Sequence, residues 1–227
     1  LVATGLDEGY YLVVLTPKTN ATTTYQPILI QKDANTNAEV TLVKAATIDV
    51  DKTITGVESM LDGSTELGGA TYNSNAAQVN IGQKVDFQIK TQIPTYSPEI
   101  LSNSTKLADF QKFTITDTPT NITLTSKDDI KVYVTANDTY SDSDLVAEDK
   151  DNTFELTLTG NVATVTFAPK YILEDVVGND GIADNANKNV FVTLKGTLDN
   201  GAATVIEGEG NPNNAKITFS NDYSTGS

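Results

Sequence analysis

The chain of 227 residues lacks several residue types on which most enzyme chemistry depends. It contains no Cys, His, Trp or Arg, and only one Met. A histidine-based triad, a cysteine nucleophile, a His/Cys zinc site and arginine clamps on phosphate are therefore excluded together. A carboxylate pair of the glycosidase kind cannot be assembled from the sequence either. We therefore expect a protein that is not an enzyme.

The charge of the chain is one-sided. Asp and Glu number 30 against 15 basic residues, all of them Lys, which gives a formal net charge of -15. Such a surface repels phosphate, so nucleic acid is not an expected partner. Hydrophobic residues still make up 38% of the chain, enough to build a core. No apolar run approaches the roughly 18 residues of a membrane span, so no membrane insertion is expected. The absence of Cys fits an extracellular or a cytosolic protein, and the solvated acidic surface favours an extracellular one.

The remaining composition is typical of β structure. Thr is abundant with 34 residues and Asn with 20, and these types favour strands and turns. Period-two alternation recurs along the chain, whereas helical periodicity is limited to one short turn near residues 173–177. We therefore predict an all-β protein, an immunoglobulin-like β-sandwich with long loop insertions. Strands are predicted at 9–15, 25–30, 40–44, 48–54, 85–93, 113–117, 130–134, 154–158, 162–167, 190–194 and 217–221.

The strand pattern divides the chain after residue 44. Residues 1–44 hold about three strands, which are too few to close a sandwich. We expect them to be the C-terminal part of a truncated N-terminal β domain. Residues 45–227 are expected to form the sandwich itself, with a hairpin turn at Gly160-Asn161.

Three predicted strands carry a polar residue where alternation requires an apolar one. Lys52, Asp117 and Asn221 each continue an inward face that otherwise consists of aliphatic or aromatic side chains. Because a buried charge is costly unless it is paired or neutralised, we expect the three side chains to meet in the core. A simpler interpretation stays open for each. Lys52 can extend to water, Asp117 can start the turn that follows it, and Asn221 can cap the end of a strand.

The segments that hold these residues resemble the isopeptide-forming sandwich domain of Gram-positive sortase-assembled pilins. They are Val50–Ile54 (VDKTI), Phe113–Pro119 (FTITDTP) and Asn214–Asp222 (NAKITFSND). That family carries a DKT entry strand, an (I/V)TDTL(P) strand and a closing NxAxxTYSND strand. The resemblance covers about residues 40–227, and the positions at which the chain departs from these patterns do not carry a reacting group.

The resemblance implies a structural subunit of a pilus, a cell-wall-anchored extracellular fibre of a Gram-positive bacterium, joined to neighbouring pilin subunits by sortase. It also implies a single-turnover self-reaction. Burial makes Lys52 a neutral nucleophile that attacks the Asn221 amide carbon with loss of ammonia, and Asp117 serves as proton donor and acceptor. The product is an intramolecular Lys-Asn isopeptide bond. Glu155 and Glu174 are the alternative acids, with Asp117 preferred.

Lys44 is the candidate lysine for linkage by sortase. Residues 9–14 and 25–30 are similar to the end of the first domain of pilin shaft subunits. In those subunits the next strand ends in a VxVYPK motif, whose lysine receives the acyl group of the neighbouring subunit. Lys44 stands at that place in VTLVK, without the Tyr-Pro of the motif. A solvated linker lysine is the alternative interpretation.

The main functional alternative is a wall-anchored surface adhesin that binds a host or extracellular-matrix ligand through the same immunoglobulin-like module. No cofactor is expected. The Asp-rich stretches at 142–151 and 175–185 leave calcium open as a ligand, although the second does not fit the register of an EF-hand loop. Acidic solvated loops are the simpler interpretation of both stretches.

Overall fold

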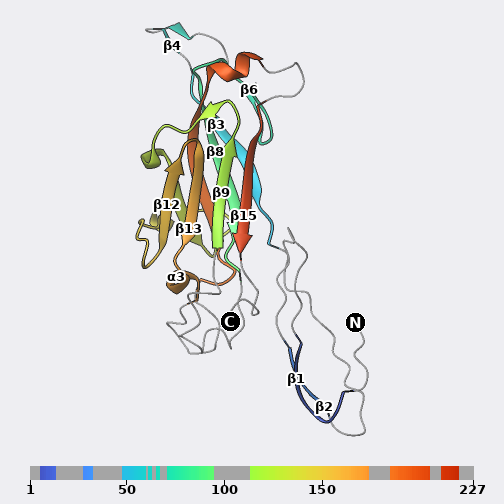
Figure 1. Cartoon of the computed structure of the whole chain (residues 1–227). Coiled ribbons are helices and arrows are strands. Elements are labelled where there is room, and N and C mark those ends of the chain that lie inside the picture. The colour runs from blue at the N-terminus through green and yellow to red at the C-terminus, as the bar shows by residue number, and fades with distance from the viewer. Residues whose placement is uncertain are drawn as a thin grey trace.

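The computed structural model of the chain describes residues 6–13, 28–32, 48–59, 61–62, 65–66, 71–94, 113–173, 185–204 and 211–219. Two antiparallel β-sheets built from residues of the predicted sandwich pack face to face (Figure 1). The predicted fold class, an all-β immunoglobulin-like sandwich, is confirmed.

The first sheet has the strand order β10-β14-β8-β3, and β11 also pairs with β14. Every pair in it is antiparallel. Along β8, buried residues alternate with more exposed ones, which places Phe87 and Ile89 inward, as period-two alternation predicts. The bounds of the strands are β3 Asp51–Val57, β8 Lys84–Gln92, β10 Ile122–Thr123, β11 Lys131–Thr135 and β14 Asn189–Leu198.

The second sheet has the strand order β12-β13-β9-β15 and is also antiparallel. The predicted hairpin turn links β12 to β13, and Gly160 adopts the left-handed conformation there, with φ +61. The bounds of the strands are β9 Phe113–Pro119, β12 Phe154–Thr159, β13 Val162–Phe167 and β15 Asn213–Phe219.

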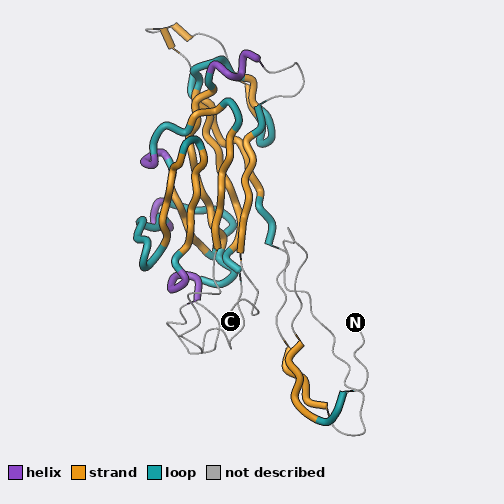
Figure 2. The backbone as a smooth tube through the Cα atoms, in the orientation of Figure 1, coloured by secondary structure: helices purple, strands orange, loops and turns teal. Residues whose placement is uncertain are grey.

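The remaining elements are short, and Figure 2 shows that those attached to the sandwich lie in its connections. Antiparallel pairs are formed by β1 Gly9–Val13 with β2 Ile28–Lys32, β4 Leu61–Asp62 with β5 Thr65–Glu66, and β6 Thr71–Tyr72 with β7 Ala77–Gln78. The helices are α3 Pro169–Leu173 and the 3₁₀-helices η1 Lys127–Asp129, η2 Asp142–Asp144 and η3 Asn200–Thr204. The predicted strand at 40–44 lies outside the described residues, and the predicted helical turn overlaps them only at its first residue, where α3 ends.

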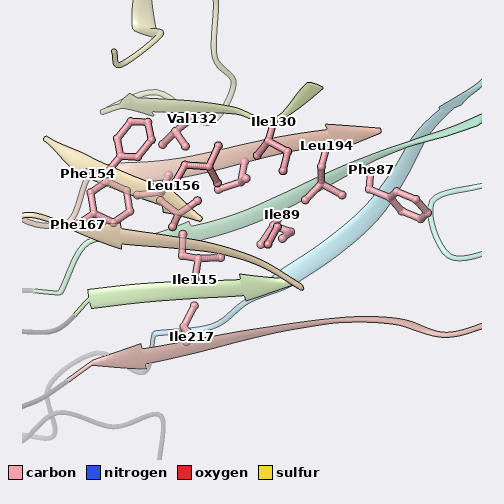
Figure 3. Packing of buried hydrophobic residues seen from close by; sticks show 14 of the residues in the cluster. Phe87, Ile89, Ile115, Ile130, Val132, Phe154, Leu156, Phe167, Leu194 and Ile217 are labelled. Carbon is pink, nitrogen blue, oxygen red and sulfur yellow. The ribbon is translucent and has the colours of Figure 1, made fainter. Parts of the chain in front are cut away.

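The core lies between the two sheets. Figure 3 shows Ile89 of the first sheet near Ile115 and Ile217 of the second, all three nearly inaccessible to water. Phe113 stacks on Phe167 with 5.2 Å between ring centroids. A side chain that points inward from β3, β9 or β15 therefore enters an apolar environment, and a charge placed there loses most of its hydration.

Gly196 on β14 lets the side chain of Ile122 on β10 approach closely. A Cβ at this position would overlap the Ile122 side chain and lie 3.5 Å from Leu124 Cδ2. We expect Gly196→Ala to lower the free energy of unfolding by about 1–3 kcal/mol through overpacking, measured by urea denaturation. Gly160→Asn is the control, because open space surrounds Gly160 and Asn tolerates its left-handed conformation. Equal stability of both variants would contradict the described packing of β10.

Candidate functional site

Lys52 lies on β3 at the edge of the first sheet, opposite Ile89 of β8. The chain just before it is held in place by two contacts. The Ile48 side chain is buried in the core, and the carbonyl oxygen of Asp49 accepts a hydrogen bond of 2.7 Å from the buried hydroxyl of Thr91. These contacts fix the position of Lys52 along the direction of the strands.

A β-bulge in β3 fixes the strand beyond Lys52. The register with β8 shifts between Ile54 and Gly56, so that Val57 returns to the inward face opposite Val85. A Cβ at Gly56 would lie 2.8 Å from Asp86 Oδ2, so a residue without a side chain fits here. The bulge lets β3 keep its apolar residues inward on both sides while Lys52 shares the inward face of Ile54.

The Lys52 side chain reaches from the first sheet to the second. Its Nζ donates a hydrogen bond to Oδ1 of Asp117 on β9, and the two groups form an ion pair. The Lys52 side chain is 10% exposed and that of Asp117 only 2%. Two residues that the sequence placed on separate inward faces are thus brought together between the sheets.

Burial acts on both members of this pair. It lowers the pKa of the Lys52 ammonium to about 8, although the attraction of Asp117 opposes this effect. It also raises the pKa of the Asp117 carboxyl, against the opposing attraction of Lys52. Both changes favour a neutral amine beside a protonated carboxyl. The Lys52 Nζ also lies 4.9 Å from the centroid of the Phe87 ring.

Asn213 is the third polar side chain at this place. The register of β15 pairs Ala215 with Asp117, so Asn213, the next inward residue, lies diagonally across from the carboxyl. The Asn213 amide acts on Asp117, because it lowers the pKa of that carboxyl against the effect of burial. Yet Asp117 Oδ2 and both amide atoms of Asn213 are buried without a hydrogen bond of ordinary geometry to any described residue. Such unpaired buried groups cost stability and indicate a functional role.

Asn221, the predicted acceptor, lies outside the described residues. Phe219, the last described residue of β15, pairs with Phe113, which is four positions before Asp117 on β9. At about 3.3 Å per residue, this separates Phe219 from the level of Asp117 by about 13 Å. In the described part of β15, the amide that reaches the carboxyl is that of Asn213.

Sequence analysis missed Asn213, although a signal for it was present. Inward alternation through Ile217 leads to the predicted Asn221 when it is followed toward the C-terminus. Followed in the other direction, it passes Ala215 and arrives at Asn213, which is also the first Asn of the NxAxxTYSND pattern. Only the pairing of β15 with β9 distinguishes the two directions.

The other predicted site residues fall into two groups. Glu155 is exposed on β12, so it is not the acid that accompanies Lys52. Glu174 and Lys44 lie outside the described residues, and their roles stay predictions. No helix in the described ranges is long and apolar enough to cross a membrane.

The described acidic loops use their carboxylates locally. Asp144 accepts hydrogen bonds from the backbone N–H and the hydroxyl of Ser141. Asp149 accepts from the backbone N–H groups of Asp151 and Asn152. Within the described residues, no group of three or more acidic side chains is arranged to hold a metal ion. The 175–185 stretch falls almost entirely outside them.

The sequence matches no protein-family model and no curated protein. Several solved structures share the fold, and two of them serve as examples. The T6 backbone pilin of serotype M6 Streptococcus pyogenes aligns with a TM-score of 0.57 and 18% identity, over 96% of this chain and 41% of that one. The fimbrial protein FimP of Actinomyces oris aligns with a TM-score of 0.51 and 18% identity, over 97% of this chain and 43% of that one. The chain thus has the fold of Gram-positive pilins and spans less than half the length of either structure.

Removal of one member of the buried pair is expected to cost more than removal of both. In a chain that carries Asn213→Ala, which removes the neighbouring carboxamide, Asp117→Leu leaves a buried ammonium without its partner. We expect the free energy of unfolding to fall by about 3–5 kcal/mol. Adding Lys52→Met removes the second charge and should recover most of that loss. Urea denaturation of the three chains measures both effects.

The exposed pair of Lys90 and Asp138, with 3.6 Å between charged atoms, is the matched control. Its single variants should change stability by less than about 1 kcal/mol. If the double variant of Lys52 and Asp117 is no more stable than Asp117→Leu alone, the pair is not buried as described.

Proposed function

We propose that the chain is part of a pilin subunit of a Gram-positive surface fibre, and that an amide bond between Lys52 and Asn213 seals its sandwich. The observation that carries the proposal is the buried contact of Lys52 with Asp117 beside the unpaired amide of Asn213. An amine, an acid and a carboxamide held together away from water are the groups that amide exchange needs. The fold supports a pilin rather than an adhesin, because the T6 pilin and FimP are fibre proteins.

The reaction is written with Asp117 protonated and Lys52 neutral. Asp117 Oδ2 donates a hydrogen bond to the amide oxygen of Asn213 and makes the amide carbon more electrophilic. Lys52 Nζ attacks that carbon and forms the new C–N bond. Asp117 transfers one proton from Nζ to Asn213 Nδ2, the Cγ–Nδ2 bond breaks, and ammonia leaves. Asp117 ends in its protonated form, so each chain reacts once and consumes no other reactant.

The bond would join β3 to β15, the first and last strands of the two described sheets. It encloses a loop of about 160 residues, and by analogy with disulfides it lowers the entropy of the unfolded chain by an equivalent of about 5 kcal/mol. Pulling force that enters at β3 and leaves at β15 would pass through the bond and not through the hydrogen bonds of the strands between them. A fibre under tension benefits from this property directly.

The same proposal includes the location and the partners of the subunit. A pilin acts at the cell surface, and its partners are neighbouring subunits that sortase joins to it. In this proposal, Lys44 remains the candidate lysine for that linkage. A host ligand is not part of the proposal, because no described feature supports one.

Intact mass tests the cross-link. Loss of ammonia lowers the mass of the chain by roughly 17 Da. Digestion after Lys then distinguishes the acceptors, because cleavage at Lys216 separates residues 196–216 from residues 217–227. We expect residues 45–84, which hold Lys52, to be joined to residues 196–216. A plain sequence mass would refute the cross-link, and a junction with residues 217–227 would assign it to Asn221.

Two controls accompany the mass measurement. Asn213→Ala should restore the full mass, whereas Asn221→Ala should not. Lys188 donates a hydrogen bond of 2.9 Å to the side-chain oxygen of Asn185, which makes a second contact between Lys and Asn side chains. No carboxyl is placed on that pair by any described contact, so it should remain unlinked.

The rate of bond formation should depend on pH with a maximum. The reactive pair holds one proton, on Asp117, and at low pH a second proton on Lys52 removes the nucleophile. The two groups share the remaining proton, and the pair loses it above the pKa of Lys52, which burial lowers to about 8. Above that pH no protonated carboxyl is left to act as the acid. The rate, followed by mass after transfer of freshly synthesised chain to each buffer, should therefore decline above about pH 8. A rate that keeps rising to pH 10 would show that Asp117 is not needed as an acid.

A further inference from the structure

We propose that Phe87 is a positioning residue of this centre, and that its ring holds the Lys52 amine in the charged form and thereby restrains bond formation. The inference rests on the proposed function, because it concerns the rate of the same reaction. The ring adds to the restraint that the ion pair with Asp117 already supplies, and burial opposes both.

The geometry places the ring against the ammonium. Phe87 lies on β8, one inward position from Ile89, which stands opposite Lys52. Its side chain is only 5% exposed, and its centroid is 4.9 Å from Lys52 Nζ. The ring packs beside Gly196 on the neighbouring strand, where a Cβ would lie 3.7 Å from Phe87 Cε2, an ordinary van der Waals distance. The pairing of β3 with β8 thus holds the amine and the ring beside each other.

The ring distinguishes the two protonation states of the amine. The negative face of an aromatic ring attracts an ammonium, whereas a neutral amine gains little from it. Asp117 is the ionisable group among the described residues that acts on the Lys52 pKa, and β8 and β15 add the apolar residues Ile89 and Ala215 nearby. The ring and Asp117 therefore both favour the charged amine, whereas desolvation favours the neutral one. Since only the neutral amine attacks, removal of the ring's attraction should speed the reaction.

The outer face of the same sheet offers a matched control. Phe191 on β14 is 2% exposed, and Lys90 Nζ lies 5.3 Å from its ring centroid. This pair repeats the contact of a lysine with a buried phenyl ring. Lys90 is paired with Asp138 at the surface, however, and lies away from the Lys52 centre. Phe191→Leu removes a buried ring of the same size without touching that centre.

The first measurement is the pKa of Lys52, followed by NMR of its side chain in the full chain with Asn213→Ala, where no bond forms. Adding Phe87→Leu should lower this pKa by about 0.4–1.5 pH units. Adding Phe191→Leu should leave it unchanged. An unchanged or higher pKa with Phe87→Leu overturns the proposal.

The second measurement is the rate of mass loss near neutral pH in chains that keep Asn213. Phe87→Leu should react about two- to thirtyfold faster than the parent chain, and Phe191→Leu at the parent rate. If Phe87→Leu does not fold, fluorinated phenylalanines at position 87 weaken the ring's attraction for a cation while keeping its shape. The rate should then rise with each added fluorine. A constant or falling rate overturns the proposal.

The two measurements separate the restraint from the proposed function. If the parent chain never loses mass, the cross-link fails, but the Lys52 pKa still reports whether the ring acts on the amine. If the parent chain loses mass and the pKa does not respond to Phe87, the cross-link stands and the restraint is refuted.

Discussion

An ammonium group buried between two apolar sheets is the constraint on which this structure depends. The core around Lys52 favours a neutral amine, and the same core favours a protonated Asp117. Inside a protein, an ion pair of this kind contributes little net stability, because the loss of hydration offsets the attraction. The proposed amide bond would remove both the amine and its charge from the core. The anchored start of β3 and its bulge fix the position of Lys52, and the pairing of β15 with β9 places Asn213 diagonally across from Asp117.

The site also connects the two sheets of the sandwich. Lys52 belongs to the first sheet, whereas Asp117 and Asn213 belong to the second. Hydrogen bonds of a β ladder act within one sheet, so nothing in the backbone pairing of β8 with β14 or β9 with β13 prevents the two sheets from separating. The proposed covalent bond from β3 to β15 would prevent it. That bond would reinforce an interface between the sheets that consists largely of hydrophobic contacts.

Much of this could be predicted from the sequence, for a physical reason. In a half-buried strand every second residue faces the core, so Lys52 and Asp117 stood out as charges on apolar faces, and the structure brings them together. Which amide lies beside them depends on the register of β15 on β9, a relation between segments far apart in the chain that local alternation does not contain. The same limit explains why the two-residue strands β4 to β7 are not predicted from the sequence.

The order of the strands determines when during folding the centre around Lys52 is complete. The centre takes one residue from the first strand of the two sheets, one from a middle strand and one from the last. It is complete only when the final strand has docked in the correct register, after every other part of the sandwich is present. Under the proposed reaction, a chain that stopped short or paired out of register would keep its ammonia. The covalent state of each molecule would then be a permanent record that this molecule once folded to completion, and mass would still reveal it after denaturation.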